Sequence, residues 1–397
     1  MLEFSSRLNN MEESATLAMS RLSRELKAQG KDIISLSLGE PDFHTPQFIK
    51  DAAVKAMNDN FTTYTPVPGY DDLRESISNK FKRDNGLNYS KTQIVVSTGA
   101  KQSLANVILS LVDDGDEVII PAPYWVSYIE IVKLAGGTPV VVEADIASDF
   151  KITDQQLESA ITPKTKMMIF STPCNPSGSV YSKGELEKLS KVIALHPNVV
   201  VIADEIYEHI NFVGKHESLA QFDNIYNQVV TVNGVSKAWA MTGWRIGYIG
   251  APQAIADACT KMQGQFTSGT CSIAQKAAIA AVDADPAILK DMIAAFLGRR
   301  DLVLEKLREI EGVKVNVPEG AFYVFPDVSY FYGKSYNGTT IHNASDLCMY
   351  LLNDALVALV SGDAFGDENC IRISYATSEE VLTEALKRVK NSLEKLG

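Results

Sequence analysis

The chain has 397 residues and contains 37 Lys and Arg against 49 Asp and Glu, so its formal net charge is −12. Hydrophobic residues make up 46% and charged residues 22%, which excludes a disordered or collagen-like chain. The acidic balance argues against a nucleic acid as partner, because no net positive field offsets the phosphate charge. No apolar run approaches the roughly 20 residues that span a bilayer, so we expect no membrane partner.

The amino-terminal stretch MLEFSSRLNNMEES contains no apolar signal core, so we expect no export signal. The five cysteines are scattered, odd in number and free of any C-x-x-C pair, which predicts reduced thiols in a cytoplasmic protein. The five histidines lack the spacing of zinc ligands, and we expect no metal site.

Short apolar runs alternate with amphipathic stretches through the middle of the chain. Seven runs predict strands, at 93–97, 117–123, 138–144, 166–173, 199–207, 229–237 and 245–252. Helices are predicted between most of them, for example at 100–112, 125–135 and 182–195. This alternation predicts an α/β fold, with a mostly parallel seven-stranded sheet sandwiched by helices. The gap before the seventh run is too short for a crossover helix, so that strand is expected to pair antiparallel or to lie elsewhere in the sheet.

After about residue 285 the pattern changes to a smaller α+β unit. Its predicted elements are a charged helix at 288–310, a strand at 314–318, an apolar run at 320–328, a helix at 345–356, strands at 355–362 and 370–376, and a final amphipathic helix. The first 45 residues hold an amphipathic helix and a turn-rich loop that we expect to pack with this unit. The predicted division is therefore a large domain, 46–285, and a small domain made of 1–45 together with 286–397.

Polar side chains follow several of the predicted strands at their carboxyl ends, where open parallel sheets bind ligands. These residues are Trp125, Asn175, Asp204, Glu205, Tyr207, Ser236 and Lys237. A Gly-bearing turn, STGAKQ, follows the first strand and opens a helix.

Each of these residue types has a use in one chemistry. A lysine forms a Schiff base with an aldehyde, and an aspartate keeps a pyridine nitrogen protonated. An indole gives a flat stacking surface, while Asn and Tyr side chains bond a phenolic oxygen. The Gly-bearing turn and Arg245 suit a phosphate dianion. Together they predict a site for pyridoxal 5′-phosphate.

Four motifs, in this order, resemble the class I and II aminotransferases of fold type I. They are PCNPSG from Pro173, ADEIY, Ser236-Lys237 followed by Arg245 in MTGWRIGY, and the late IRISYA. The resemblance runs from Gly39 in LGEPDF to Arg372, and LGEPDF, APYWVSY and GAKQ are similar to the bacterial aspartate aminotransferase subgroup Ib. It implies a pyridoxal-phosphate-dependent transferase that works as a homodimer with shared active sites.

The resemblance also implies a role for each matching residue. Lys237 is implied as the catalytic residue, which binds the cofactor aldehyde and then moves the α proton of the substrate. Asp204 is implied to pair with the pyridine nitrogen, Tyr207 and Asn175 to bond the ring oxygen, and Trp125 to stack on the ring and border the substrate. The implied phosphate site comprises Arg245, Ser236, the amides of Gly99, Ala100 and Lys101, and Tyr64 of a neighbouring subunit. Arg372 is implied to bind the substrate α-carboxylate, with Gly39 and Asn175 assisting.

Two positions depart from the family pattern. Gly234 stands where many relatives carry a phosphate-binding hydroxyl, and whether Ser236 replaces it stays open. Ser177 replaces the commoner threonine of the PCNPSG loop and keeps its hydroxyl. Specificity rests on Lys101, whose counterpart in the subgroup binds the distal carboxylate of dicarboxylic amino acids. With Thr16, the same lysine is associated in some relatives with transamination of prephenate.

The leading interpretation is an aspartate aminotransferase that transfers the amino group of L-aspartate to 2-oxoglutarate by a ping-pong mechanism, giving oxaloacetate and L-glutamate. A glutamate/aspartate-prephenate aminotransferase is the alternative. Another pyridoxal-phosphate reaction, such as β-elimination or decarboxylation, and a non-catalytic protein that kept the fold are the rivals. Taken singly, several residues have plainer readings: Asp204 and Glu205 as a helix cap, Trp125 as core, and Arg372 as an edge residue.

Overall fold

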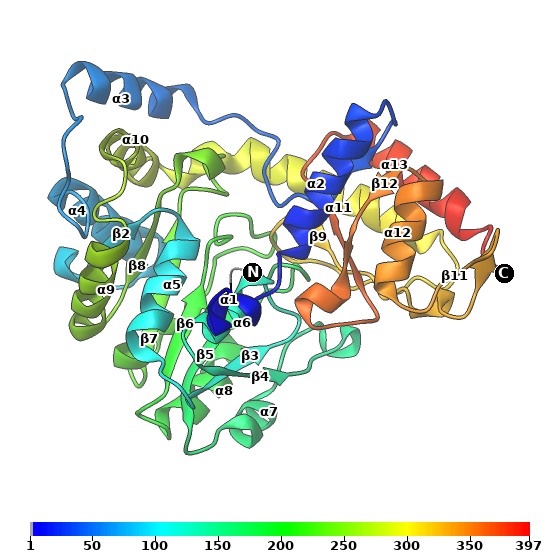
Figure 1. Cartoon of the computed structure of the whole chain (residues 1–397). Coiled ribbons are helices and arrows are strands. Elements are labelled where there is room, and N and C mark those ends of the chain that lie inside the picture. Colours follow the sequence, from blue (N-terminus) through cyan, green and yellow to red (C-terminus); the bar gives the residue numbers. More distant parts are fainter. Residues whose placement is uncertain (1–2) are drawn as a thin grey trace.

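The computed structural model describes residues 3–397, so the first two residues of the predicted small domain lie outside it. Its centre is a seven-stranded sheet with the order β2-β8-β7-β6-β5-β3-β4 (Figure 1). The strands are β2 (Ile94–Ser97), β3 (Glu117–Pro121), β4 (Thr138–Val142), β5 (Thr165–Ser171), β6 (Val200–Asp204), β7 (Val229–Gly234) and β8 (Gly247–Gly250). β8 pairs antiparallel with β2 and β7, and the other neighbours are parallel, which confirms the antiparallel option for the seventh run.

Helices cover both faces of this sheet. Alternate residues of β2 show the two-sided burial: Ile94 and Val96 join one buried cluster, whereas Val95 joins another. The helices are α3 (Gln47–Asn58), α4 (Asp71–Lys80), α5 (Ala100–Leu111), α6 (Ser127–Leu134), α7 (Asp154–Ala160), α8 (Lys183–Ala194), α9 (Gln253–Phe266) and α10 (Ser272–Asp283). Because both faces are buried, the strands are continuously apolar, which is the pattern that the sequence shows.

A smaller group of elements lies beside the sheet, and the long helix α11 (Lys290–Arg308) runs between the two (Figure 1). A three-stranded antiparallel sheet, β13-β14-β9, forms its centre. Its elements are α1 (Ser6–Asn9), α2 (Ala15–Ala28), β1 (Ile34–Ser35), β9 (Tyr323–Val324), β10 (Ser335–Tyr336), β11 (Thr339–Thr340), α12 (Ala344–Asp354), β12 (Val357–Ala358), β13 (Val360–Ser361), β14 (Ile371–Ser374) and α13 (Glu379–Leu393). β1 pairs with β12, so the amino-terminal segment packs on the carboxyl-terminal unit as expected.

Two predicted strands of this unit are wrong in detail. Residues 314–318 form no strand: only Lys314 pairs, with Asp327, and Pro318 has no amide hydrogen to donate. The predicted strand at 355–362 begins only after Leu356, which has a left-handed φ of 56°. It then divides at Leu359 into β12 and β13, which pair with different strands.

Candidate active site

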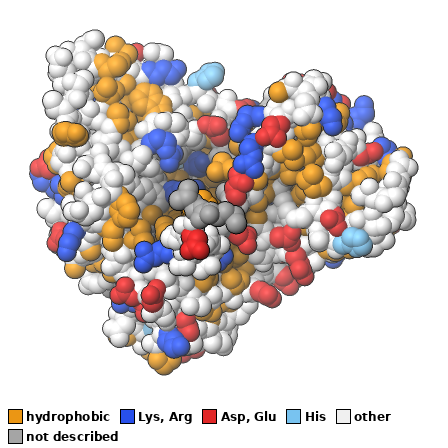
Figure 2. Space-filling model, viewed as in Figure 1, with side chains coloured by type: hydrophobic (Ala, Val, Ile, Leu, Met, Phe, Trp, Pro, Cys, Tyr) orange, Lys and Arg blue, Asp and Glu red, His pale blue; other side chains and the backbone are white. Residues whose placement is uncertain are grey.

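A pocket of about 360 Å³ lies where the carboxyl edge of the large sheet faces the smaller unit. The turns after β5, β6 and β7 and the start of α5 contribute one side of it. The start of α2, the loop at 38–40 and strand β14 contribute the other. Figure 2 shows that this face of the molecule is hollowed at its centre and that Lys and Arg side chains lie around the hollow.

Lys237 stands in the turn after β7, with its Nζ donating a 2.7 Å hydrogen bond to the carbonyl oxygen of Gly39. Burial and the nearby Arg372 guanidinium lower the pKa of Lys237 to about 8. An amine with this pKa is unprotonated in about a tenth of the molecules at pH 7, far more than for an ordinary lysine, and this is the form that attacks a carbonyl.

Asp204 is the last residue of β6 and is 5% exposed. Its Oδ2 accepts a hydrogen bond of 2.7 Å from the hydroxyl of Tyr128, and Oδ1 accepts one of 3.3 Å from the amide of Ile206. Burial raises the pKa of Asp204 to about 6, although these hydrogen bonds oppose the rise. A buried carboxylate aimed at a pocket is suited to pair with a cationic ring nitrogen.

The start of α5 forms an anion-binding corner. Gly99 precedes the helix with a φ of +84°, and a side chain at this position would collide with the Arg245 guanidinium. Arg245 itself has a left-handed φ of 57°, a strained conformation found at functional sites. Free amide groups at a helix start, together with a guanidinium, bind a phosphate well.

Lys101 follows in the first turn of α5, with its Nζ 4.9 Å from the centre of the Trp125 ring. Burial and the charge of Arg245 lower the pKa of Lys101. A cation at a helix start is electrostatically unfavourable without an anion beside it.

Arg372 lies on β14, the central strand of the small sheet, and is only 1% exposed. Its Nη1 donates to Oδ1 of Asn175 at 3.0 Å, and its Nη2 donates to the carbonyl oxygen of Ser37 at 2.5 Å. The guanidinium packs against the rings of Tyr323 and Phe365, and its Nε has no hydrogen-bond partner. Among residues 3–397 no carboxylate pairs with Arg372, so this buried cation has room for a carboxylate from a ligand.

Most of the predicted site residues line this single pocket. They are Gly39, Ala100, Lys101, Trp125, Asn175, Asp204, Tyr207, Ser236, Lys237, Arg245 and Arg372, and Thr16 lines it too. Gly99 lies immediately before the pocket-lining helix start. Tyr64 does not line the pocket and is 99% exposed on the surface.

Comparison with known proteins agrees with this arrangement. The family model for aminotransferases of class I and II matches residues 31–389. The chain belongs to this family. A bifunctional aspartate aminotransferase and glutamate/aspartate-prephenate aminotransferase of Petunia hybrida is 47% identical over 99% of this chain and 83% of its own. An aspartate/prephenate aminotransferase of Nitrosomonas europaea is 46% identical over 99% of this chain and 100% of its own.

Solved structures show the same fold for this aminotransferase. The aspartate aminotransferase of Rhizobium meliloti superposes with a TM-score of 0.97 at 43% identity, covering 100% of both chains. That of Thermus thermophilus with maleate gives 0.93 at 39% identity, covering 99% of this chain and 100% of that one. The predicted fold type I architecture is thereby confirmed.

Class I and II aminotransferases use pyridoxal 5′-phosphate, and the pocket of this aminotransferase fits that group. It offers an amine of lowered pKa on Lys237, a buried carboxylate on Asp204, an indole on Trp125, and an anion-binding corner at Arg245. Among the described residues no group of three or more His, Cys, Asp or Glu could hold a metal ion. No described helix is long and apolar enough to cross a membrane.

Two residues of the site escaped the sequence analysis. Tyr128 bonds Asp204, and Tyr323 shares a 2.8 Å hydroxyl contact with Tyr207. Tyr128 follows Trp125 by three residues in the helix predicted at 125–135, and that spacing is a signal that both face the same site, although the helix itself begins at Ser127. Tyr323 lies on the short strand β9, where no motif marks it.

Proposed function

We propose that this aminotransferase is an aspartate aminotransferase. It binds pyridoxal 5′-phosphate and transfers the amino group of L-aspartate to 2-oxoglutarate in two successive half-reactions, giving oxaloacetate and L-glutamate. The observation that carries the proposal is a pair of cations without carboxylate partners among the described residues, Arg372 and Lys101, in the pocket that also holds Lys237. A dicarboxylic substrate supplies one carboxylate for each of them.

The cofactor would be held by groups that already converge on the pocket. Lys237 would bind its aldehyde and Asp204 its ring nitrogen, while Trp125 supports the ring. Its ring oxygen would be bonded by Asn175 and Tyr207, and its phosphate by Arg245, Ser236 and the start of α5 at Gly99, Ala100 and Lys101. When bound, pyridoxal 5′-phosphate supplies an electron sink for the α-carbon of the substrate.

The substrate would be oriented by its two carboxylates. Arg372 would bind the α-carboxylate as a fork, with Asn175 and the Gly39 backbone nearby, and Lys101 would bind the distal carboxylate beside Trp125. The amine of Lys237 would then take the α proton, because a pKa of about 8 lets it accept and return a proton near neutral pH.

We further propose that the enzyme is a homodimer with shared active sites. Tyr64 supports this assignment, because a side chain that is 99% exposed on its own chain is available to a neighbouring pocket. The proposed domains remain 46–285 and 1–45 together with 286–397. We place the enzyme in the cytoplasm, with small amino acids and 2-oxo acids as its partners, and its five cysteines are free thiols.

Transamination of prephenate is a second candidate. Thr16 supports it, because its Oγ1 lies 3.5 Å from Nη2 of Arg372 at the edge of the pocket. Two of the relatives described above carry this activity in their names.

A coupled assay of amino acid and 2-oxo acid pairs, including prephenate, tests both proposals. We expect transfer from L-aspartate to 2-oxoglutarate to be fastest. Transfer to prephenate would support the second candidate function, and the absence of transfer to prephenate would exclude it. Release of ammonia or carbon dioxide from aspartate would indicate elimination or decarboxylation instead. A protein that stays colourless with added pyridoxal 5′-phosphate would contradict the proposal altogether.

A further inference from the structure

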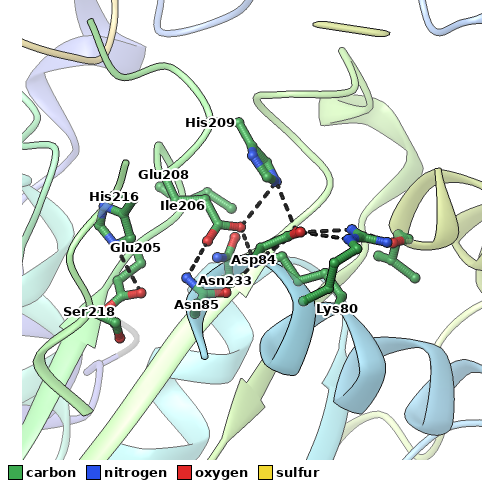
Figure 3. A network of polar contacts seen from close by, with 12 residues as sticks. Lys80, Asp84, Asn85, Glu205, Ile206, Glu208, His209, His216, Ser218 and Asn233 are labelled. Atoms are coloured by element: carbon green, nitrogen blue, oxygen red, sulfur yellow. Dashed lines mark hydrogen bonds and ion pairs between the residues drawn. The ribbon is translucent and has the colours of Figure 1, made fainter. Parts of the chain in front are cut away.

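A buried ionic cluster (Figure 3) lies outside the pocket and includes Glu205, the residue that follows Asp204 in the chain. It comprises Lys80, Asp84, Glu205, Glu208, His209 and His216. These residues come from the end of α4, the π-helix η1 (Phe81–Asn85), the turn after β6 and the loop before residue 219. A π-helical turn is a frequent companion of functional sites, and none of the roles proposed above uses this cluster.

Glu205 forms the part of the cluster next to Asp204. It is 0% exposed, and its Oε2 lies 3.0 Å from Nε2 of His216, which is itself 8% exposed. Its Oε1 accepts a 2.7 Å hydrogen bond from the hydroxyl of Ser218. The amide of Glu205 donates to the carbonyl oxygen of Val232 at 2.9 Å, so the peptide that joins it to Asp204 is tied to β7.

Glu208 forms the second part with Lys80, with which it makes a buried ion pair. Its other oxygen accepts a 2.8 Å hydrogen bond from Asn85, which in turn accepts one of 2.8 Å from Lys80. Asp84 lies 3.8 Å from the Lys80 amine. His209 lies 3.3 Å from Glu208, but burial lowers its pKa, so it is neutral near pH 7.

Arg83 makes a 2.6 Å ion pair with Asp84, so the three carboxylates near Asp204 face three cations when Arg83 is counted with Lys80 and His216. Burial alone would lower the pKa of His216, but Glu205 and Glu208 outweigh burial and the charge of Lys80, so the pKa is raised and the positively charged form is favoured. The same Glu205 anion acts to raise the pKa of Asp204, against Tyr128 and Lys237, which lower it. Without the His216 cation, the buried carboxylate of Glu205, next to Asp204 in the chain, would have no compensating charge beside it.

We propose that His216 is a positioning residue for Asp204: by pairing with Glu205 it keeps the interior behind Asp204 neutral and the end of β6 fixed, so that Asp204 stays ionised toward the cofactor. This inference rests on the proposed binding of pyridoxal 5′-phosphate. It predicts that removing the His216 cation and removing the Glu205 anion change the pH dependence of cofactor binding differently. A merely structural contact would give the same change in both variants.

The test is the dissociation constant of pyridoxal 5′-phosphate, measured from pH 5 to 8 on the full chain stripped of cofactor. In His216→Gln we expect Asp204 and Glu205 to share a proton up to a higher pH. The pH below which cofactor binding is lost should therefore rise by about one unit, and the dissociation constant should increase about tenfold in that pH range. Glu205→Gln removes the anion that His216 compensates, and is expected to produce no upward shift. The double variant returns to the wild-type profile.

His209→Gln is the matched control, because it alters a histidine of the same cluster that is already neutral, and its binding profile should follow the wild type. A His216→Gln profile that superimposes on the wild type would overturn the inference, as would an equal upward shift in Glu205→Gln. If His216→Gln does not fold, the Glu205→Gln protein is sufficient for the test. An upward shift of its pH profile of cofactor binding would contradict the inference. A wild-type protein that binds no pyridoxal 5′-phosphate would instead overturn the proposed function.

Discussion

The hydroxyl of Tyr128 donates a 2.7 Å hydrogen bond to Oδ2 of Asp204, and both residues are buried. Tyr128 belongs to α6, on one face of the sheet, while Asp204 ends β6. This hydrogen bond from a helix holds the Asp204 carboxylate in position. It also lowers the pKa of Asp204, against the effect of burial.

Tyr128→Phe removes the hydroxyl and leaves the ring. A hydrogen bond to a charged group contributes about 1.5–3 kcal/mol, so cofactor affinity should fall about tenfold to a hundredfold. Absorbance titration with pyridoxal 5′-phosphate measures this. Tyr375→Phe is the control, because its buried hydroxyl donates to the carbonyl of Ala321 away from the pocket, and an equal loss of cofactor affinity there would contradict the role of Tyr128.

Asp204→Asn should stabilise the cofactor-free protein above pH 6. Burial raises the pKa of Asp204 from 3.8 to about 6, so keeping it ionised in the folded state costs stability above that pH and nothing below about 4. A shift of this size corresponds to roughly 3 kcal/mol. The gain, measured by denaturant unfolding, should grow from about pH 4 to about pH 6 and stay level above that pH, and a gain independent of pH would refute this explanation.

Lys101→Met should discriminate between substrates. Losing one charge-assisted contact costs about 1.5–3 kcal/mol, so kcat/KM for aspartate should fall about tenfold to a hundredfold while alanine and phenylalanine change little. Lys151→Met, at a lysine paired with Asp149 and Glu185 outside the pocket, is the matched control. An equal loss for all amino acids would reject a distal-carboxylate role for Lys101.

Arg372→Lys should instead weaken every amino acid alike, because the α-carboxylate is common to all of them. A lysine keeps the charge but cannot form the two parallel bonds of the guanidinium, and it leaves Asn175 without its donor. We expect kcat/KM to fall about tenfold or more for both aspartate and alanine. A loss confined to aspartate would assign Arg372 to the distal carboxylate.

The sequence predicted the large sheet and most of the pocket because both follow from local pattern. Continuous apolar runs mark strands that are buried on both faces, and ligand-binding residues follow the carboxyl ends of parallel strands. Asn175, Asp204 and Lys237 each come within a few residues of such an end.

What the sequence missed depends on long-range packing. Tyr128 reaches Asp204 from a helix, and the pairing of His216 with Glu205 joins a loop to a strand end without a shared motif. Residues 314–318 look like a strand, yet Asn316 turns its side chain to Asp149 and Ser177 instead of joining a ladder. These side-chain contacts depend on residues that are distant in sequence, so local sequence patterns do not predict them.

The central claim is a transfer in two half-reactions, and a single-turnover experiment tests it most directly. Protein saturated with pyridoxal 5′-phosphate is mixed with L-aspartate and no 2-oxo acid, and the products are counted per active site. We predict one oxaloacetate per site, no ammonia or carbon dioxide, and then one L-glutamate per site on adding 2-oxoglutarate, with neither product from Lys237→Ala. Release of ammonia or carbon dioxide, or no oxaloacetate at all, would contradict the account.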